Sequence, residues 1–309
     1  MLSKTLFVTH PACLGHEMQA GHFESPERLR AIVSKLEASG AMARMERVEA
    51  PACLDEKVIG RAHDLALWRR IVSAAPGSGR SAVSPEAIMS PGTLDAISRG
   101  VGGAVEAVER VCSGRNPNAF VAVRPPGHHA TRSEAMGFCF VNNAAIGALH
   151  ALGALGLSRV AIVDIDVHHG NGTEDIVASD PRLFMASTFG LGIYPGNGER
   201  PLGENMANVG LAPGAGGAQM RARVLSEVIP ALDAFAPQLV VVSAGYDAHL
   251  DDPLGNQGWD ESDYAWWFHE LKGVAARHAQ GRLVAVLEGG YDVDALARSV
   301  RASVEELMA

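Results

Sequence analysis

Six short apolar runs alternate along the chain with alanine-rich segments of helical character, and this alternation limits the fold more than any other feature. Runs that are apolar throughout, and not only at every second residue, are typical of parallel strands buried on both faces. We therefore predict an α/β fold with a parallel sheet and helices on both of its faces. The strands are expected at Thr5–Thr9, Ala119–Val123, Val160–Ile165, Leu183–Thr188, Leu239–Ser243 and Leu283–Glu288, and the helices at Pro26–Ser39, Pro91–Cys112, Asn142–Leu155, Ala218–Ala234, Glu261–Ala279 and Val293–Glu306.

Four of the expected strands run directly into a polar motif, at the end of the strand where open α/β sheets build their sites. The first motif joins Val160–Ile165 to two aspartates, two histidines and a glycine turn. Because side chains alternate along a strand, Asp164, Asp166 and His168 would share one face. Aspartate and histidine together are typical ligands of zinc. The segment therefore predicts a metal site.

A second motif, Arg-Pro-Pro-Gly-His-His at 124–129, follows the strand Ala119–Val123. Tandem histidines point to opposite sides of an extended backbone, so one site can use both only after a sharp turn. The Pro-Pro-Gly sequence supplies such a turn. Together with the metal site, this predicts that His128 and His129 are a general base and its partner.

Two further motifs follow the strands Leu239–Ser243 and Leu283–Glu288. A catalytic zinc usually has three protein ligands and one open position, and the third ligand could be Asp251 or Asp252. The spacing alone does not show which of these two aspartates is the third ligand. In the other motif, paired glycines let the backbone approach a ligand closely, and Tyr291 could donate its hydroxyl to a carbonyl oxygen.

The motifs together resemble the histone deacetylase family, in the family's order and over most of the chain. The resemblance implies the arginase/deacetylase fold, in which a single domain (here 1–309) contains a sheet of about eight strands. Asn171 and the Arg-Pro-Pro before Gly127 resemble the class II branch and its bacterial relatives. The matching segments are RPPGHHA (124–130), GFCFVNNAAI (137–146), DIDVHHGNGTEDI (164–176), SAGYDAHLDDPLG (243–255) and LEGGYD (287–292).

By this resemblance, specific residues acquire expected roles in metal binding and catalysis. Zinc, with iron(II) as the alternative, is expected on Asp166, His168 and Asp252. His129 matches the general base and His128 its neighbour. Asp164 matches the carboxylate partner of His128, and Asn171 matches the residue that faces His129. Tyr291 matches the donor to the substrate carbonyl oxygen.

The resemblance also implies a substrate channel and a structural potassium ion. The channel walls match Gly137, Phe138 and Tyr194. The potassium ligands match Asp164, Asp166, His168, Ser187 and Thr188. Ser187-Thr188-Phe189 departs from the family's usual Ser-Leu-His, which puts the details around this ion in doubt. The resemblance also suggests a second, more distant potassium position near Val177, Asp180 and Leu183.

The implied reaction is hydrolysis of an N-acetylated amine, with acetyl-lysine in proteins or peptides as the expected substrate. An acetylpolyamine amidohydrolase is the first alternative. Polyamine-selective relatives have a glutamate where this chain has Leu254, which favours acetyl-lysine. A ureohydrolase with two manganese ions is a second alternative, and an inactive metal-binding partner protein is a third. The oligomeric state cannot be derived from the sequence.

Composition adds limits on partners and location. The net charge of −9 comes without a basic stripe, so we expect no direct nucleic-acid binding. Unpaired cysteine spacing and the lack of a long apolar segment predict free thiols, no membrane contact and a cytoplasmic location. Cys139 is expected to be a small apolar wall residue. The segment 15–27, with His16, His22 and Glu24, is expected to be a loop beside the substrate mouth, with a metal site as the alternative.

Overall fold

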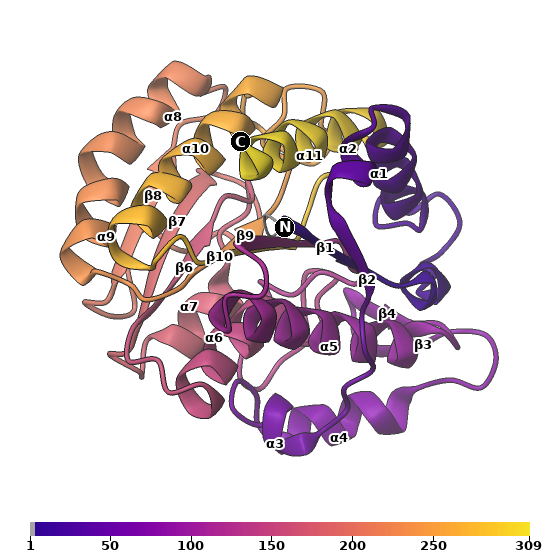
Figure 1. Ribbon diagram of the computed structural model, residues 1–309. Coiled ribbons are helices and arrows are strands. Elements are labelled where there is room, and N and C mark those ends of the chain that lie inside the picture. Colours follow the sequence, from indigo (N-terminus) through magenta and orange to yellow (C-terminus); the bar gives the residue numbers. More distant parts are fainter. Residues whose placement is uncertain (1–3) are drawn as a thin grey trace.

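Eight parallel strands form one sheet in the computed structural model, which describes residues 4–309 (Figure 1). This confirms the predicted α/β architecture, and the six predicted strands lie within two residues of their expected ends. The sheet order is β2-β1-β5-β10-β9-β6-β7-β8. The strands are β1 (Leu6–Thr9), β2 (Glu46–Glu49), β5 (Asn118–Val121), β6 (Val160–Asp164), β7 (Leu183–Gly190), β8 (Met206–Leu211), β9 (Val240–Ala244) and β10 (Leu283–Leu287).

The two strands that were not predicted lie at the two edges of the sheet. β2 has the sequence Glu-Arg-Val-Glu, with half-buried and exposed residues in alternation, so no apolar run marks it. β8 lies inside Gly190–Gly217, the glycine- and proline-rich segment that was interpreted as loops, and this part of the interpretation was wrong. An edge strand needs burial on fewer sides, which is why its sequence is less apolar.

Helices cover both faces of the sheet (Figure 1). α5 and α6 pack together on one face, and α1, α10 and α11 pack on the other. The predicted helix Ala218–Ala234 is interrupted by a wider π-helical turn at Val224–Val228, just before Pro230. Proline has no N–H for the helical ladder, which explains a local change of pitch there. The helices are α1 (Glu27–Ala38), α2 (Ala41–Arg44), α3 (Glu56–Ile59), α4 (Leu65–Ala74), α5 (Thr93–Cys112), α6 (Asn143–Ala154), α7 (Asn171–Val177), α8 (Gly217–Arg223), α9 (Ile229–Phe235), α10 (Glu261–His278) and α11 (Val293–Met308).

A small antiparallel hairpin lies outside the sheet. It is formed by β3 (Ser81–Ser84) and β4 (Ala87–Met89), and its turn contains Glu86. The hairpin was not predicted, because its strands have only four and three residues and β3 is largely half buried. It matters for the site because it carries Glu86 toward the carboxyl ends of the sheet strands.

The four strands that precede polar motifs are neighbours at the centre of the sheet, in the order β5-β10-β9-β6. Their registers align the carboxyl ends, since Ser243 lies opposite both Asp164 on β6 and Val286 on β10. All four motifs therefore leave the sheet at one edge and meet there. This convergence places the candidate site.

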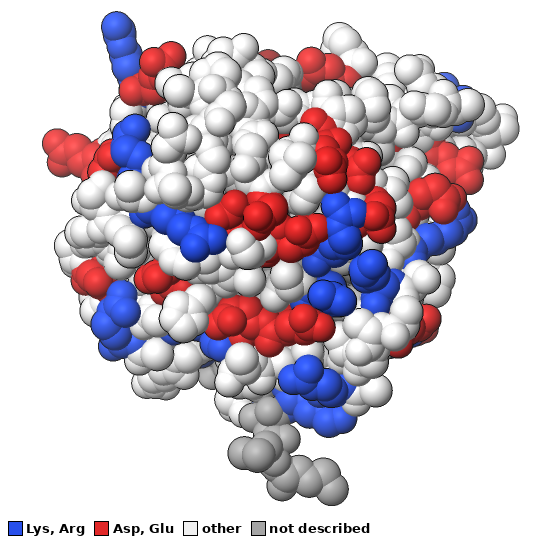
Figure 2. Space-filling model, turned by 90° about the horizontal axis from the view of Figure 1, so that it is seen from above, with Lys and Arg blue, Asp and Glu red and all other residues white. Residues whose placement is uncertain are grey.

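The surface and the helices add two observations. Basic and acidic side chains are interspersed on the face shown in Figure 2, so neither sign of charge dominates that face. Within residues 4–309, no helix combines the length and the apolar character that crossing a membrane requires. All four cysteines are unpaired, as predicted.

Candidate active site

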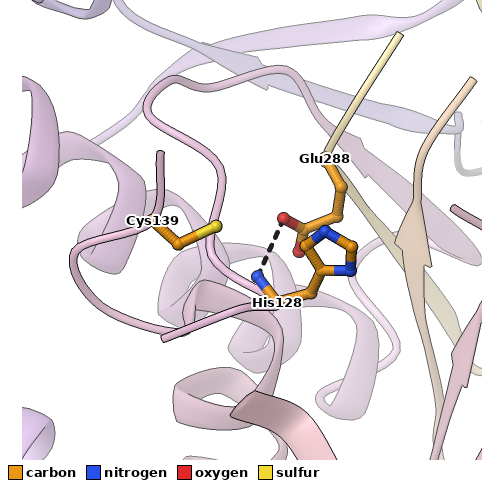
Figure 3. A group of neighbouring side chains, drawn as sticks. All are labelled: His128, Cys139 and Glu288. Carbon is orange, nitrogen blue, oxygen red and sulfur yellow. Dashed lines mark hydrogen bonds between the residues drawn. The ribbon is translucent and has the colours of Figure 1, made fainter. Parts of the chain in front are cut away.

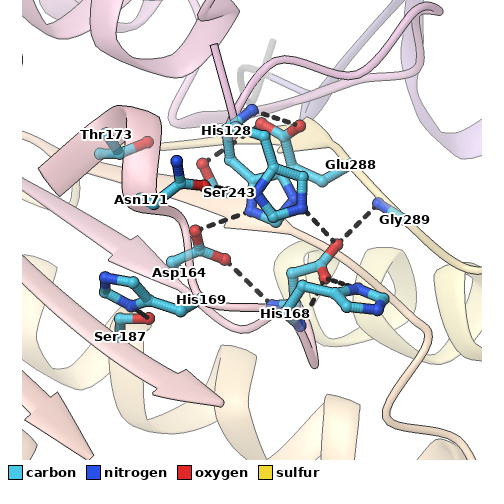
Figure 4. A network of polar contacts seen from close by, with 12 residues as sticks. His128, Asp164, His168, His169, Asn171, Thr173, Ser187, Ser243, Glu288 and Gly289 are labelled. Carbon is cyan, nitrogen blue, oxygen red and sulfur yellow. Dashed lines mark hydrogen bonds and ion pairs between the residues drawn. The ribbon is translucent and has the colours of Figure 1, made fainter. Parts of the chain in front are cut away.

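The two histidines of the 124–129 motif come from one tight turn and enter the same site. Figure 4 shows His128 there, beside Asp164 and Glu288. The backbone N–H groups of Gly127 and His128 donate to one oxygen of Glu288, at 2.6 and 3.1 Å, and this fixes the turn. The two imidazole rings lie 3.9 Å apart between centroids. The turn therefore brings both rings inward, as the Pro-Pro-Gly sequence predicted.

Each histidine has a different partner on its Nδ1 atom. His128 Nδ1 lies 3.0 Å from a carboxylate oxygen of Asp164, and His129 Nδ1 lies 2.8 Å from the amide oxygen of Asn171. Asn171 is the first residue of α7, so the start of this helix sets the position of the amide. These are the pairings expected from the sequence.

The partners and the burial separate the pKa values of the two rings. Burial alone would lower the pKa of His128, but the carboxylates of Asp166 and Asp164 outweigh it and raise the pKa to about 10. Burial lowers the pKa of His129, and the neighbouring His128 and His168 lower it further, to well below the ordinary value. At neutral pH, His128 carries a proton and His129 is free to accept one.

Replacing Asn171 with aspartate is expected to shift the pH dependence of activity. An anionic partner 2.8 Å from Nδ1 would favour the protonated form of His129 and raise its pKa by about one to three units. The base must be unprotonated to work, so the acidic limb of the kcat/KM profile should move to higher pH. The measurement is kcat/KM against pH for both proteins, and an unchanged profile would remove Asn171 from this role.

A buried group of carboxylates and one imidazole lies beside the histidine pair. The strand β6 ends at Asp164, so Asp166 and His168 lie in the loop that follows and not on the strand face, contrary to the simple alternation argument. The loop nevertheless brings them together. One ligand atom each from Asp166, His168 and Asp247 lies within 4.8 Å of the others.

Asp247 has a place in this group that was not assigned from the sequence. One of its oxygens accepts the Val167 N–H at 2.8 Å, and the other lies 3.1 Å from His168 Nδ1. Burial raises the pKa of Asp247 to about 7. The signal was present in the sequence, since Asp247 follows the apolar strand β9 within Gly-Tyr-Asp, but that position alone is also typical of a turn.

Asp252, the expected third ligand, lies close by but outside that compact group. Its oxygens accept the backbone N–H groups of Tyr291 at 2.6 Å, Asp292 at 3.2 Å and Leu254 at 2.9 Å. Burial raises the pKa of Asp252, and repulsion from Asp166 adds to the rise. The structure therefore places Asp252 between the site and the segment that carries Tyr291.

A cavity of about 260 Å³ opens above His129 and His168. The expected channel residues Gly137, Phe138, Tyr194 and Leu254 all lie in its wall, together with Tyr291. Two wall residues were not predicted, Ile193 and Glu86. The lining residues are Glu86, His129, Gly137, Phe138, His168, Ile193, Tyr194, Leu254 and Tyr291.

Backbone geometry explains why position 137 in the cavity wall is a glycine. Gly137 has φ +53° and lies so close to His129 that a Cβ would be 2.4 Å from the ring. Phe138 has φ +67°, a conformation that costs a non-glycine residue about 1–3 kcal/mol. This conformation directs the Phe138 ring to the cavity, where it lies edge-on to Tyr291 at 6.1 Å.

Glu86 reaches the cavity from the β3–β4 turn. One of its oxygens accepts the Tyr194 hydroxyl at 2.7 Å and the Gly137 N–H at 2.9 Å. Its side chain is half buried. The cavity therefore has one carboxylate among walls that are otherwise mainly apolar and aromatic.

Cys139 is buried beside the histidine turn and Glu288 (Figure 3). Burial raises the pKa of its thiol well above the ordinary value, which leaves it protonated and a poor nucleophile. The thiol donates to the carbonyl oxygen of Gly137 at 3.3 Å. These contacts agree with an unreactive, buried thiol, but Cys139 lies behind the residues that line the cavity, so its predicted place in the wall is not confirmed.

Some of the residues expected around potassium have hydrogen-bond partners within the protein, and others do not. The Ser187 hydroxyl lies 3.1 Å from His169 Nδ1, and the Thr188 hydroxyl is buried without a hydrogen-bond partner in the described chain. At the second position considered, the side-chain nitrogen of Asn205 donates toward the carbonyls of Val177, Asp180 and Leu183, at 3.0, 3.2 and 3.0 Å. Potassium stays a prediction at the first position, and at the second the two N–H groups of the Asn205 amide already face the carbonyls.

The sequence and the fold of this chain are similar to those of known proteins. A model of the histone deacetylase domain matches residues 22–307. The chain belongs to the histone deacetylase family. This supports a deacetylase that hydrolyses amides, and it does not support the ureohydrolase alternative.

Individual relatives agree with this assignment. The chain is 36% identical to the histone deacetylase-like amidohydrolase of Pseudomonas aeruginosa, over 93% of this chain and 77% of that protein. It is 30% identical to type-2 histone deacetylase 2 of Dictyostelium discoideum over 99% of this chain, but it spans only 21% of that much longer protein. The crystal structure of the HDA15 HD domain matches with a TM-score of 0.90 and 29% identity, covering 99% of this chain and 90% of that one. The arginase/deacetylase fold of the histone deacetylases is thereby confirmed.

Proposed function

We propose that this deacetylase is a metal-dependent amidohydrolase that removes acetyl groups from N-acetylated amines, with acetyl-lysine in proteins or peptides as the main substrate. One observation carries the proposal: His129, His168 and Tyr291 all face a single cavity with mainly apolar walls. A base, a metal-binding imidazole and a hydroxyl donor thus surround the end of a channel suited to a methylene chain.

The residues at the base of the cavity fit a divalent cation. The carboxylates of Asp166, Asp247 and Asp252 are buried and lie close enough to repel one another. Burying several like charges is costly unless a cation compensates them. We assign Asp166, His168 and Asp252 as the ligands, with zinc as the expected metal and iron(II) as the alternative, since this donor set suits both. Asp247, which accepts the Val167 N–H, would hold the ligand loop in place.

Bound there, zinc would lower the pKa of a water molecule and polarise the substrate carbonyl. His129, unprotonated at neutral pH, would take the proton of the attacking water and later deliver it to the leaving amine. Tyr291 would donate its hydroxyl to the carbonyl oxygen as negative charge develops. His128, already protonated, would add positive charge beside His129. The products are acetate and the free amine.

Removal of the metal is expected to abolish activity and lower stability. In the metal-free protein the buried carboxylates lose their counter-ion, so the melting temperature should fall. Zinc at 100 times its Kd should then restore about 2.7 kcal/mol of unfolding free energy. The measurements are thermal unfolding and activity, after chelation and after zinc return. Equal melting curves for the two forms would contradict a metal site at this position.

Two variants distinguish a metal ligand from a residue that only orients a metal ligand. Asp252→Asn is expected to weaken zinc affinity by more than about 100-fold, whereas Asp247→Asn should weaken it by about 10–100-fold. Zinc affinity measured by competition with a chelator distinguishes them. The reverse order would make Asp247 the third ligand.

Glu86 favours a second candidate, an acetylpolyamine amidohydrolase. Leu254 lies in the cavity wall without charge, which suits the stem of acetyl-lysine. The Glu86 carboxylate could instead attract the distal ammonium of a polyamine, because an opposite charge in a partly dry cavity is attractive. Either substrate keeps the same chemistry at the scissile amide.

The experiment that tests the function is kcat/KM on an acetyl-lysine peptide, acetylputrescine and acetylspermidine, measured with the zinc-loaded protein and with Glu86→Gln. We expect the peptide to be preferred and Glu86→Gln to change the peptide rate by less than threefold. A polyamine preference that falls at least tenfold in Glu86→Gln would establish the second candidate. Inactivity on all three with metal bound would indicate other acyl groups or small metabolites as substrates.

A further inference from the structure

Glu24 lies in segment 15–27, which was expected to be a loop beside the substrate mouth, and its carboxylate is fully buried. Both oxygens accept from the guanidinium of Arg124, which binds through Nε and Nη2. The same carboxylate accepts Nη1 of Arg28 at 3.3 Å, and His16 Nε2 lies 3.3 Å away. One buried anion thus holds two buried guanidinium groups.

Arg28 extends this network to the segment that carries Tyr291. Its Nε donates to the Gly290 carbonyl at 2.7 Å and its Nη2 donates to the Glu288 carbonyl. Its guanidinium lies 5.0 Å from the centre of the Tyr291 ring, within the range of a cation–π contact. Arg28 therefore holds the backbone on both sides of Gly289 and the ring itself.

Arg124 extends the network in the other direction. It donates to the carbonyls of Cys13 and His16, at 3.0 and 3.1 Å. It also immediately precedes the turn that ends in His128 and His129. The position of Arg124 therefore sets where this turn leaves the sheet.

We propose that Glu24 is a positioning residue that holds the His129 turn and the Tyr291 segment in register by fixing Arg124 and Arg28 together. This inference rests on the proposed function for His129 and Tyr291. Burial would raise the pKa of Glu24, but Arg124 and His16 outweigh burial and hold the pKa well below its usual range. Glu24 does not line the cavity, so it acts on turnover through the two arginines and not through substrate contact.

The test uses the metal-loaded full chain with Glu24→Gln, Arg28→Gln and Arg124→Gln. Hydrogen exchange is measured in peptides that cover 124–129 and 287–292, where the N–H groups of Gly127 and Gly289 are hydrogen-bonded within the site. Glu24→Gln is expected to speed exchange at least tenfold in both segments. Arg124→Gln should do so mainly in 124–129, and Arg28→Gln mainly in 287–292.

Kinetics on the best substrate give the second readout. Glu24→Gln should lower kcat at least tenfold and leave KM within twofold. The matched control is Asp263→Asn, which also removes a buried carboxylate that binds an arginine, Arg221, at 2.7 Å, but on α10. Asp263→Asn should leave hydrogen exchange unchanged in both 124–129 and 287–292. Unchanged exchange in both segments of Glu24→Gln, or exchange raised equally along the whole chain, would overturn the proposal.

Two arrangements keep the test decisive. If Glu24→Gln does not fold, the charge-balanced double variant Glu24→Gln/Arg28→Gln replaces it. That variant should speed exchange in 124–129 beyond Arg28→Gln alone, and no added effect there would overturn the proposal. If the wild-type protein turns over none of the substrates, the proposed function fails, while the exchange data still decide whether Glu24 joins the two segments.

Discussion

Phenylalanine in place of Tyr291 is expected to lower kcat by about two to three orders of magnitude while zinc stays bound. The loss of one donor to a developing oxyanion typically costs about 2.7–4 kcal/mol of transition-state stabilisation. Tyr291 faces the cavity, and burial raises its pKa well above the ordinary value, so the hydroxyl keeps its proton for donation. The ring, the Arg28 contact and the backbone bond to Asp252 remain in the variant. The measurement is kcat and KM with zinc content determined in parallel.

Tyr264→Phe is the matched control for this prediction. Tyr264 on α10 is fully buried, its hydroxyl has no hydrogen-bond partner among the described residues, and it does not line the cavity. Its removal should leave kcat within twofold. Near-normal turnover of Tyr291→Phe with zinc bound would remove Tyr291 from the mechanism.

Alanine in place of His129 is expected to lower kcat by about 10²- to 10⁴-fold, the usual contribution of a positioned base. His128 cannot replace it, because its pKa of about 10 leaves it protonated at neutral pH. The acidic limb of the pH profile should also disappear, since the group that must be unprotonated is gone. The measurement is kcat over a range of pH, with zinc content and melting temperature as checks.

His150→Gln is the control for a buried imidazole outside the site. His150 lies on α6 and its Nε2 atom is 2.9 Å from Glu109. The variant should keep the wild-type pH profile even if its melting temperature falls. If His129→Ala kept kcat within threefold of the wild type, the proton would have to be taken by another group.

Much of the fold was readable from local sequence because short, continuous apolar runs bounded by polar motifs are typical of parallel strands buried on both faces. The six predicted strands and most predicted helices were confirmed for that reason. The failures occurred where burial is incomplete. The edge strands β2 and β8 and the β3–β4 hairpin have no apolar run longer than three residues, so their formation depends on what lies beside them.

The residues of the candidate site fall into the same two groups, those that local sequence indicates and those that it does not. His128, His129, Asp166, His168 and Tyr291 stand in motifs whose residue types already indicate the chemistry. Glu86, Glu24 and Arg28 do not, because a single glutamate or arginine in a loop or helix has no distinctive local pattern. Only their contacts with Tyr194, Arg124 and Gly290 give them a place in the site.

The sequence by itself determined the class of fold and the family, and it predicted which residues carry the chemistry, because strand burial and metal or acid–base motifs are local properties. Only the tertiary structure decided that β5, β10, β9 and β6 are neighbours, so that motifs more than a hundred residues apart meet at one edge. It also decided that Glu86 enters the cavity wall and that Glu24 joins two arginines behind it. These contacts depend on strand order and on packing between distant segments, and neither is encoded in any short stretch of the chain.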